Sequence, residues 1–214
     1  MTRIESRRGR RAALQALCAA DPVLARLIED AGDGDLWSWR TRWPGDPFSL
    51  LVRSIVGQQI STQAANAIFG RLQGVLGDDV SAAALARRRD DELLAAGLSH
   101  AKLASLRDLS ARVLSGDLPL ERAPDLSDGD LRRCLTAVRG IGPWTAELFL
   151  LALGREDALP AADVGLRRAV RRVYGLDHLP TTLEVEALGE GWRPYRSLAA
   201  LFLYRSLRPA GELE

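Results

Sequence analysis

The chain has 214 residues, enough to bury one substantial hydrophobic core, either as a single domain or as two small lobes. Its 29 basic and 28 acidic residues leave a formal charge of +1, which excludes a polycation. Contact with a polyanion must therefore depend on a local patch and on oriented backbone amides.

The sequence predicts neither a secretory signal nor a membrane span. The basic N-terminus MTRIESRRGRR has no apolar stretch behind it, and no apolar run is long enough to cross a bilayer. Cys18 and Cys134 lie in apolar helical patterns and match no metal-ligand spacing, so we expect both to be reduced. These features predict a cytoplasmic protein with no membrane partner.

Nearly every segment has a helical pattern and none shows strand alternation, which predicts an all-α fold. Helix starts are marked by Asp21-Pro22 and Asp46-Pro47, where an N-cap precedes a first-turn proline. Six further N-caps are expected at Ser61, Ser81, Asp90, Ser99, Ser127 and Asp163. For six helices the pattern predicts both ends, at residues 10–19, 82–88, 91–96, 100–115, 164–174 and 195–207.

Two loops interrupt this pattern. Residues 32–46 contain Trp37, Trp39 and Trp43, which we expect to pack between two lobes rather than to stack on bases. The apolar stripe that begins at Phe48 breaks at the sequence Gly-Gln-Gln-Ile of residues 57–60. Two adjacent glutamines are unusual at an ordinary helix end.

The segment of residues 135–168, LTAVRGIGPWTAELFLLALGREDALPAADVGLRR, carries the clearest functional pattern. It predicts a helix, the hairpin Gly140-Ile141-Gly142-Pro143, a second helix, and Asp163 at the start of another. The two glycines permit a sharp turn and a close approach, and the free amides of the following helix face outward. Such an arrangement binds anions, and phosphate is the natural candidate.

The run GIGPWTA, followed by LP, two small residues and DVGLR, resembles the helix-hairpin-helix DNA glycosylase superfamily, and within it the DNA-3-methyladenine glycosylase II family. The resemblance extends from about residue 12 to 207 and includes LVRSIVGQQIS and RPYRSLAALFLYR. It implies one glycosylase domain, residues 1–214, with two helical lobes flanking a DNA-binding cleft and no N-terminal β-domain. Lobe one covers about 1–45 plus 164–214, and lobe two about 46–163, with the helix-hairpin-helix at 127–154.

The resemblance implies a monofunctional glycosylase that flips alkylated bases such as 3-methyladenine out of double-stranded DNA and leaves an abasic site. Asp163 matches the essential carboxylate. Breaking an N-glycosidic bond builds positive charge on the sugar, which a carboxylate stabilises while it orients the attacking water. Taken alone, Asp163 would merely cap helix 164–174, and the two roles are compatible.

Trp144 stands where bifunctional members of the superfamily have a lysine that attacks the sugar. The only lysine is Lys102, so no strand-cleaving activity is expected. The chain also lacks the four cysteines that follow the aspartate in relatives with an iron–sulfur cluster. We therefore expect no required cofactor.

By the same matching, Trp144 and Tyr204 line the pocket for the flipped base, where stacking and cation–π attraction hold a cationic purine by about 1–2 kcal/mol. Ordinary core packing is the alternative for Tyr204. Leu148 occupies a pocket position that is aromatic in some relatives. Gln59 matches the wedge that fills the gap in the duplex, and Gln58 is expected to satisfy backbone groups at the broken helix end.

The resemblance assigns phosphate contacts to Gly140, Gly142 and Thr145. It also implies a cation at the hairpin, held by the backbone carbonyls of Thr136, Val138 and Ile141. The expected partner is double-stranded DNA with a damaged base. We expect a monomer that works on nucleoid DNA in the cytoplasm.

Two alternatives remain. A damaged-DNA-binding protein without catalysis would keep the hairpin and the wedge but would need no ionised carboxylate. A glycosylase for oxidised or mismatched bases is disfavoured by the missing lysine and cluster cysteines.

Overall fold

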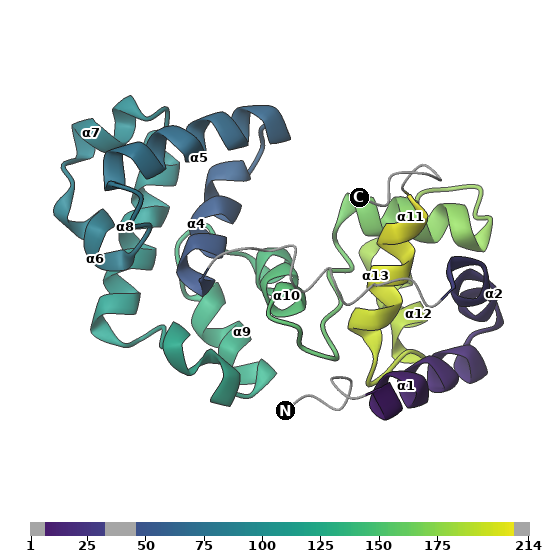
Figure 1. Cartoon of the computed structure of the whole chain (residues 1–214). Coiled ribbons are helices and arrows are strands. Elements are labelled where there is room, and N and C mark those ends of the chain that lie inside the picture. The colour runs from purple at the N-terminus through teal and green to yellow at the C-terminus, as the bar shows by residue number, and fades with distance from the viewer. Residues whose placement is uncertain (1–6, 33–45, 208–214) are drawn as a thin grey trace. The chain divides into compact units, whose positions relative to one another are not determined.

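The computed structural model describes residues 7–32 and 46–207, and every regular element in these ranges is a helix (Figure 1). This confirms the all-α prediction. None of these helices combines the length and apolar character that crossing a bilayer requires. Trp37, Trp39 and Trp43 lie outside the described residues, so their expected packing role stays a prediction.

The helices fall into two compact units. The first unit comprises residues 1–42 and 150–214, and the second comprises residues 43–149. The described helices of the second unit are α4 (Pro47–Gly57), α5 (Thr62–Leu76), α6 (Ala82–Arg87), α7 (Asp90–Ala95), α8 (His100–Ser115), the 3₁₀ helix η1 (Leu120–Asp125) and α9 (Asp128–Thr136). Helix α10 (Pro143–Ala152) starts in the second unit and ends in the first, which also holds α1 (Arg7–Ala20), α2 (Pro22–Ala31), α11 (Val164–Tyr174), α12 (Thr182–Glu190) and α13 (Arg196–Ser206).

Helix α13 is the central element of the first unit, where it contacts α2 and α11 (Figure 1). Every residue of this helix from Ser197 to Leu203 is buried, because neighbours cover the helix on several sides. Trp192, only 1% exposed, packs in the same core.

A polar network crosses this core. Asp21 caps α2 through the N–H groups of Val23 and Leu24, as predicted. Its other oxygen, Oδ2, accepts hydrogen bonds from the Tyr174 hydroxyl and the Trp192 indole N–H. Three helical regions are thus tied to one carboxylate.

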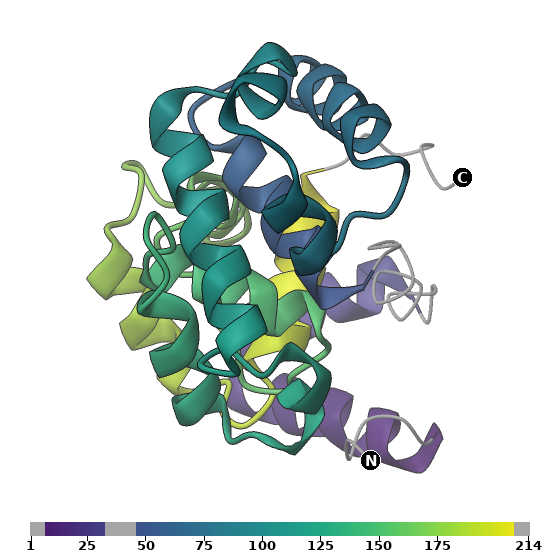
Figure 2. The same ribbon diagram turned by 90° about the vertical axis from the view of Figure 1, so that its left-hand side faces the viewer.

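In the second unit, α4 packs against α5 and α8, and α6 packs against α8. Figure 2 looks onto the side of this unit that carries α6, α7 and α8. The predicted stripe of α4 is buried: Phe48, Leu51, Val52, Ile55 and Val56. Periodicity therefore identified the core face of this helix correctly.

Most predicted caps are confirmed, including Asp46, Ser61, Ser81, Ser99 and Ser127. The prediction for Asp90 is wrong. Helix α7 starts one residue earlier, with Arg89 at the N-cap, because the Glu92 carboxylate accepts a hydrogen bond from the Arg89 N–H at 2.8 Å. Asp90 instead pairs with Arg107.

Two further differences concern the C-terminal half. No helix was predicted at Thr182–Glu190, yet α12 forms there with a capping box between Thr181 and Glu184. The last helix starts at Arg196 rather than 195.

Both cysteines are free and half-buried, Cys18 on α1 and Cys134 on α9.

Candidate functional site

The turn that joins α9 to α10 adopts a hairpin that requires one of its two glycines. Gly140 has a φ of +79°, in the left-handed region that other residues rarely adopt. A Cβ at this position would also lie 2.5 Å from the hydroxyl oxygen of Ser105 on α8. Ile141 is buried and anchors the turn to the core.

Contacts from other elements of the same unit fix this hairpin. The Arg139 N–H donates to the Asp108 carboxylate at 2.7 Å, and the Gln58 side-chain amide donates to the Gly140 carbonyl at 2.9 Å. Burial alone raises the pKa of Asp108, but the Arg139 N–H and the Arg112 guanidinium outweigh it, so the net pKa lies below the usual value. Asp108 is therefore a permanent anionic acceptor at neutral pH.

The start of α10 offers open donors. Its first hydrogen bond joins the Ala146 N–H to the Gly142 carbonyl at 3.1 Å. The N–H groups of Gly142, Trp144 and Thr145 donate to no residue in the described ranges. Together with the positive end of the helix dipole, these amides form an arrangement suited to an anion.

Gly142 differs from Gly140 because the fold does not require a glycine there. It has no left-handed φ, and a Cβ would meet nothing within 4 Å. The missing side chain keeps the neighbouring amides open to a group that approaches from outside. The side chain of Thr145 is buried, so only its backbone N–H can take part, whereas Trp144 is 39% exposed. Leu148, one turn further along α10, is half-buried.

The turn between α4 and α5 carries the candidate wedge. Gln59 is exposed and has a φ of +60°, a backbone conformation that costs a non-glycine residue roughly 1–2 kcal/mol. Such strain often accompanies a functional position. Gln58 was expected to satisfy its own helix end, but that prediction is wrong because its side chain reaches the hairpin instead.

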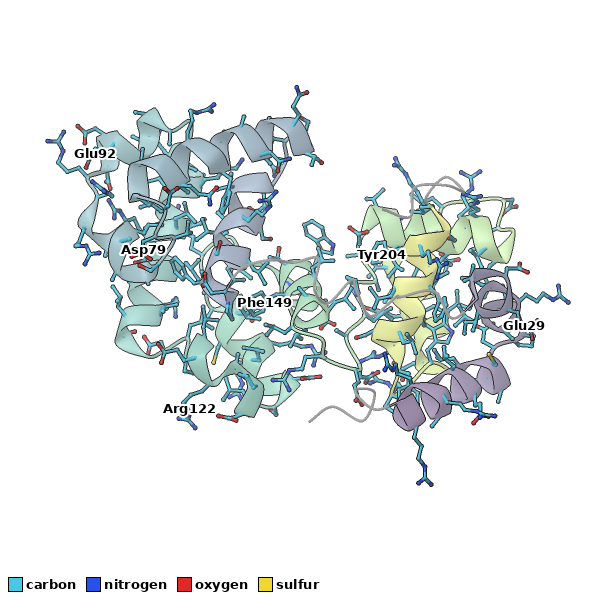
Figure 3. The ribbon with its side chains drawn as sticks, viewed as in Figure 1. Glu29, Asp79, Glu92, Arg122, Phe149 and Tyr204 are labelled. Carbon is cyan, nitrogen blue, oxygen red and sulfur yellow. The ribbon has the colours of Figure 1, made fainter. Side chains whose placement is uncertain are left out.

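Asp163 lies in the first unit, at the N-cap of α11. Its Oδ1 atom accepts the Leu166 N–H at 2.8 Å, so the predicted cap is confirmed. The same oxygen accepts the Tyr204 hydroxyl of α13 at 2.9 Å. Figure 3 labels Tyr204 at the end of α13 that lies near α11. The structure thus joins two of the predicted site residues directly.

Several residues that shape the candidate site were not identified from the sequence. Ser105 and Asp108 lie on α8 and contact the hairpin. Lys102 of the same helix donates from its ammonium group to the Val56 carbonyl at 2.8 Å. Gly165 lies against both Asp163 and Tyr204. Only Gly165 had a local signal, since a glycine in the first turn of a helix is unfavourable without a packing reason.

The two helices α9 and α10, joined by a hairpin with open amides, form a helix-hairpin-helix motif. Residues 52–194 match the family described as HhH-GPD superfamily base excision DNA repair protein. The chain belongs to this superfamily, which confirms the resemblance seen in the sequence.

Individual relatives are similar over most of the chain. DNA-3-methyladenine glycosylase 1 of Schizosaccharomyces pombe is 34% identical over 77% of this chain and 74% of its own length. The crystal structure of a Bacillus halodurans DNA-3-methyladenine glycosidase superposes with a TM-score of 0.81 at 34% identity, covering 95% of this chain and 90% of the other. The Schizosaccharomyces pombe enzyme in complex with abasic DNA gives a TM-score of 0.78 at 29% identity, covering 93% and 98%.

Proposed function

We propose that this chain is a DNA-3-methyladenine glycosylase of base excision repair. It flips an alkylated base out of double-stranded DNA and hydrolyses the N-glycosidic bond. The observation that carries the proposal is the carboxylate of Asp163, held at the positive end of α11 by two hydrogen bonds to one of its oxygens. The activity of the similar enzymes supports the substrate class.

The chemistry needs little beyond this carboxylate. An alkylated purine carries positive charge and is already a good leaving group, so the protein has to stabilise the cationic sugar that forms as the bond breaks. Asp163 supplies the negative charge and orients the attacking water. The exposed ring of Trp144 provides an aromatic surface for the cationic base.

The reaction stops at the abasic site in this proposal. Lys102 is the only lysine of the chain, and its amine is engaged with the Val56 carbonyl in the second unit. An amine that attacks the sugar is therefore not expected, and the DNA strand stays intact.

We also infer that the protein acts as a monomer on nucleoid DNA in the cytoplasm.

The hairpin is proposed to hold the DNA backbone, with Gln59 filling the gap that the flipped nucleotide leaves. The amides of Gly142 and Thr145 would bind a phosphate of the lesion strand.

We also propose that the carbonyls of Thr136, Val138 and Ile141 bind a cation. Those of Thr136 and Ile141 accept no hydrogen bond from the described residues, while that of Val138 accepts the Ile141 N–H at 3.0 Å. Such a cation would add positive charge beside the phosphate.

A duplex with a single methylated purine tests the function. We expect release of the free methylated base, and strand breakage only after treatment with alkali. Binding without base release would indicate a damage-recognition protein, and strand breakage without alkali would contradict the monofunctional reaction. Release of oxidised or mismatched bases in preference to methylated ones would contradict the substrate class.

Replacing Gly142 with phenylalanine should weaken DNA binding by about ten- to a hundredfold, because the ring covers amides whose hydrogen bonds to a charged phosphate are worth about 1.5–3 kcal/mol. The thermal midpoint should not change, since the position has free space. Fluorescence anisotropy with an abasic duplex measures the affinity.

Gly74→Phe on α5 is the matched control, because this glycine also has nothing within 4 Å and is exposed. Equal DNA affinity of the two variants would exclude the hairpin as the phosphate site.

A further inference from the structure

The two oxygens of the Asp163 carboxylate have different surroundings. Oδ1 accepts the Leu166 N–H at 2.8 Å and the Tyr204 hydroxyl at 2.9 Å. No residue in the described ranges donates to Oδ2. Within the described part of the chain, one oxygen is therefore fully used by the protein, and the other keeps its lone pairs for a ligand.

Gly165 makes this arrangement possible. A Cβ at this position would lie 2.8 Å from Oδ1 of Asp163 and 3.5 Å from Cε1 of Tyr204. Gly165 has no left-handed φ, so its backbone could accept another residue. Position 165 must lack a side chain because Asp163 and Tyr204 lie so close to it. We call Asp163, Gly165 and Tyr204 the carboxylate clamp.

Tyr204 is a suitable donor for the clamp. The pKa of its hydroxyl is raised, first by burial and then by the negative charge of Asp163, so the group stays protonated at neutral pH. Its ring packs against the core of the first unit, beside buried residues of α13. A hydroxyl on a fixed ring restricts the rotation of the carboxylate that it contacts.

We propose that Tyr204 is a positioning residue: with the Leu166 N–H it holds Oδ1 of Asp163, so that Oδ2 is the oxygen that acts on the sugar and the water. This inference rests on the proposed glycosylase reaction. It gives Tyr204 a role different from that of a wall for the flipped base, because a wall needs the aromatic ring and the clamp needs the hydroxyl.

Tyr204→Phe separates these roles, since it removes the hydroxyl and keeps the ring. We expect the single-turnover rate of base release to fall about tenfold, because the carboxylate loses its fixed orientation. The affinity for a duplex with an uncharged abasic analogue should stay unchanged. A rate within twofold of the wild type would overturn the proposal, as would a parallel loss of rate, affinity and thermal stability.

Tyr174→Phe is the matched control. Tyr174 also donates its hydroxyl to a carboxylate of the first unit, that of Asp21. Loss of the Tyr174 hydroxyl should lower the thermal midpoint and leave the rate of base release intact. The reverse pattern is expected for Tyr204→Phe, so a purely structural hydroxyl and a positioning hydroxyl give opposite results.

Gly165→Ala tests the clamp from its other side and should also slow base release, because the added methyl group displaces Oδ1. In the Asp163→Asn background, Tyr204→Phe should have no further effect. If Asp163→Asn abolishes base release while Tyr204→Phe does not slow it, the glycosylase function stands and the clamp is wrong. If Asp163→Asn releases base normally, the proposed function itself loses its basis.

Discussion

Asp163→Asn should slow single-turnover release of methylated base by roughly a hundred- to a thousandfold, the effect typical of removing one preorganised electrostatic stabiliser. Asparagine keeps an oxygen that can accept the Leu166 N–H, so α11 should retain its cap. What disappears is the negative charge beside the sugar. The rate is measured with enzyme in excess over a duplex that carries one 3-methyladenine or 7-methylguanine.

Asp46→Asn is the control for this experiment. Asp46 is also an N-cap, of α4, and its carboxylate accepts the N–H groups of Phe48 and Ser49. It should release base at the wild-type rate. If Asp163→Asn retained a third or more of the wild-type rate, Asp163 would be a helix cap and nothing more.

Asp21→Ala should destabilise the protein by about 3–5 kcal/mol, the sum of a lost cap and of two donors, one buried and one half-buried, that lose their acceptor. The Trp192 indole N–H donates to Asp21 at 2.9 Å from a ring that is 1% exposed. The Tyr174 hydroxyl donates to the same oxygen. Urea denaturation followed by circular dichroism measures the free energy of unfolding.

The matched variant is Asp46→Ala, which removes a cap with only backbone partners and should cost about 1 kcal/mol. If Asp21→Ala were no less stable than Asp46→Ala, the network through Tyr174 and Trp192 would contribute nothing.

The same network makes stability depend on pH. Burial raises the pKa of Asp21, but the hydrogen bonds from Tyr174, Trp192 and two backbone amides outweigh it, so the pKa lies below its usual value. A carboxylate with a lowered pKa stabilises the fold fully above its unfolded value of about 3.9 and loses this contribution as the pH falls through its folded value. Acid should therefore destabilise the wild type more steeply than Asp21→Ala.

Most of the helices could be predicted because their starts are local. A capping side chain and a first-turn proline act within three residues, so Asp21, Asp46 and Asp163 were identified as caps without tertiary information. The errors have local causes as well. Asp90 competes with two neighbouring acidic residues for the start of α7, and the Glu92 carboxylate decides the outcome. The Thr181–Glu184 capping box was the signal for the missed α12.

The site could be predicted only residue by residue. Asp163, Gly140 and Gly142 follow from local pattern and from resemblance. The contacts that organise them join distant positions: Tyr204 meets Asp163 across 41 residues, and Gln58 meets Gly140 across 82. Side-chain contacts of this kind have no periodic signature, so only the folded chain reveals them. The distinction between Gly140, which the turn requires, and Gly142, which it does not, also depends on the surrounding atoms.

The central claim is that Asp163 stabilises a sugar that becomes positively charged, and transition-state mimicry tests it most directly. Affinity is measured for two duplexes, one with a cationic pyrrolidine abasic analogue and one with the neutral tetrahydrofuran analogue. The wild type should prefer the cationic duplex by roughly a hundredfold, and Asp163→Asn should lose most of that preference. An equal preference in both proteins would contradict the account, because the charge of Asp163 would then have no part in stabilising the cation.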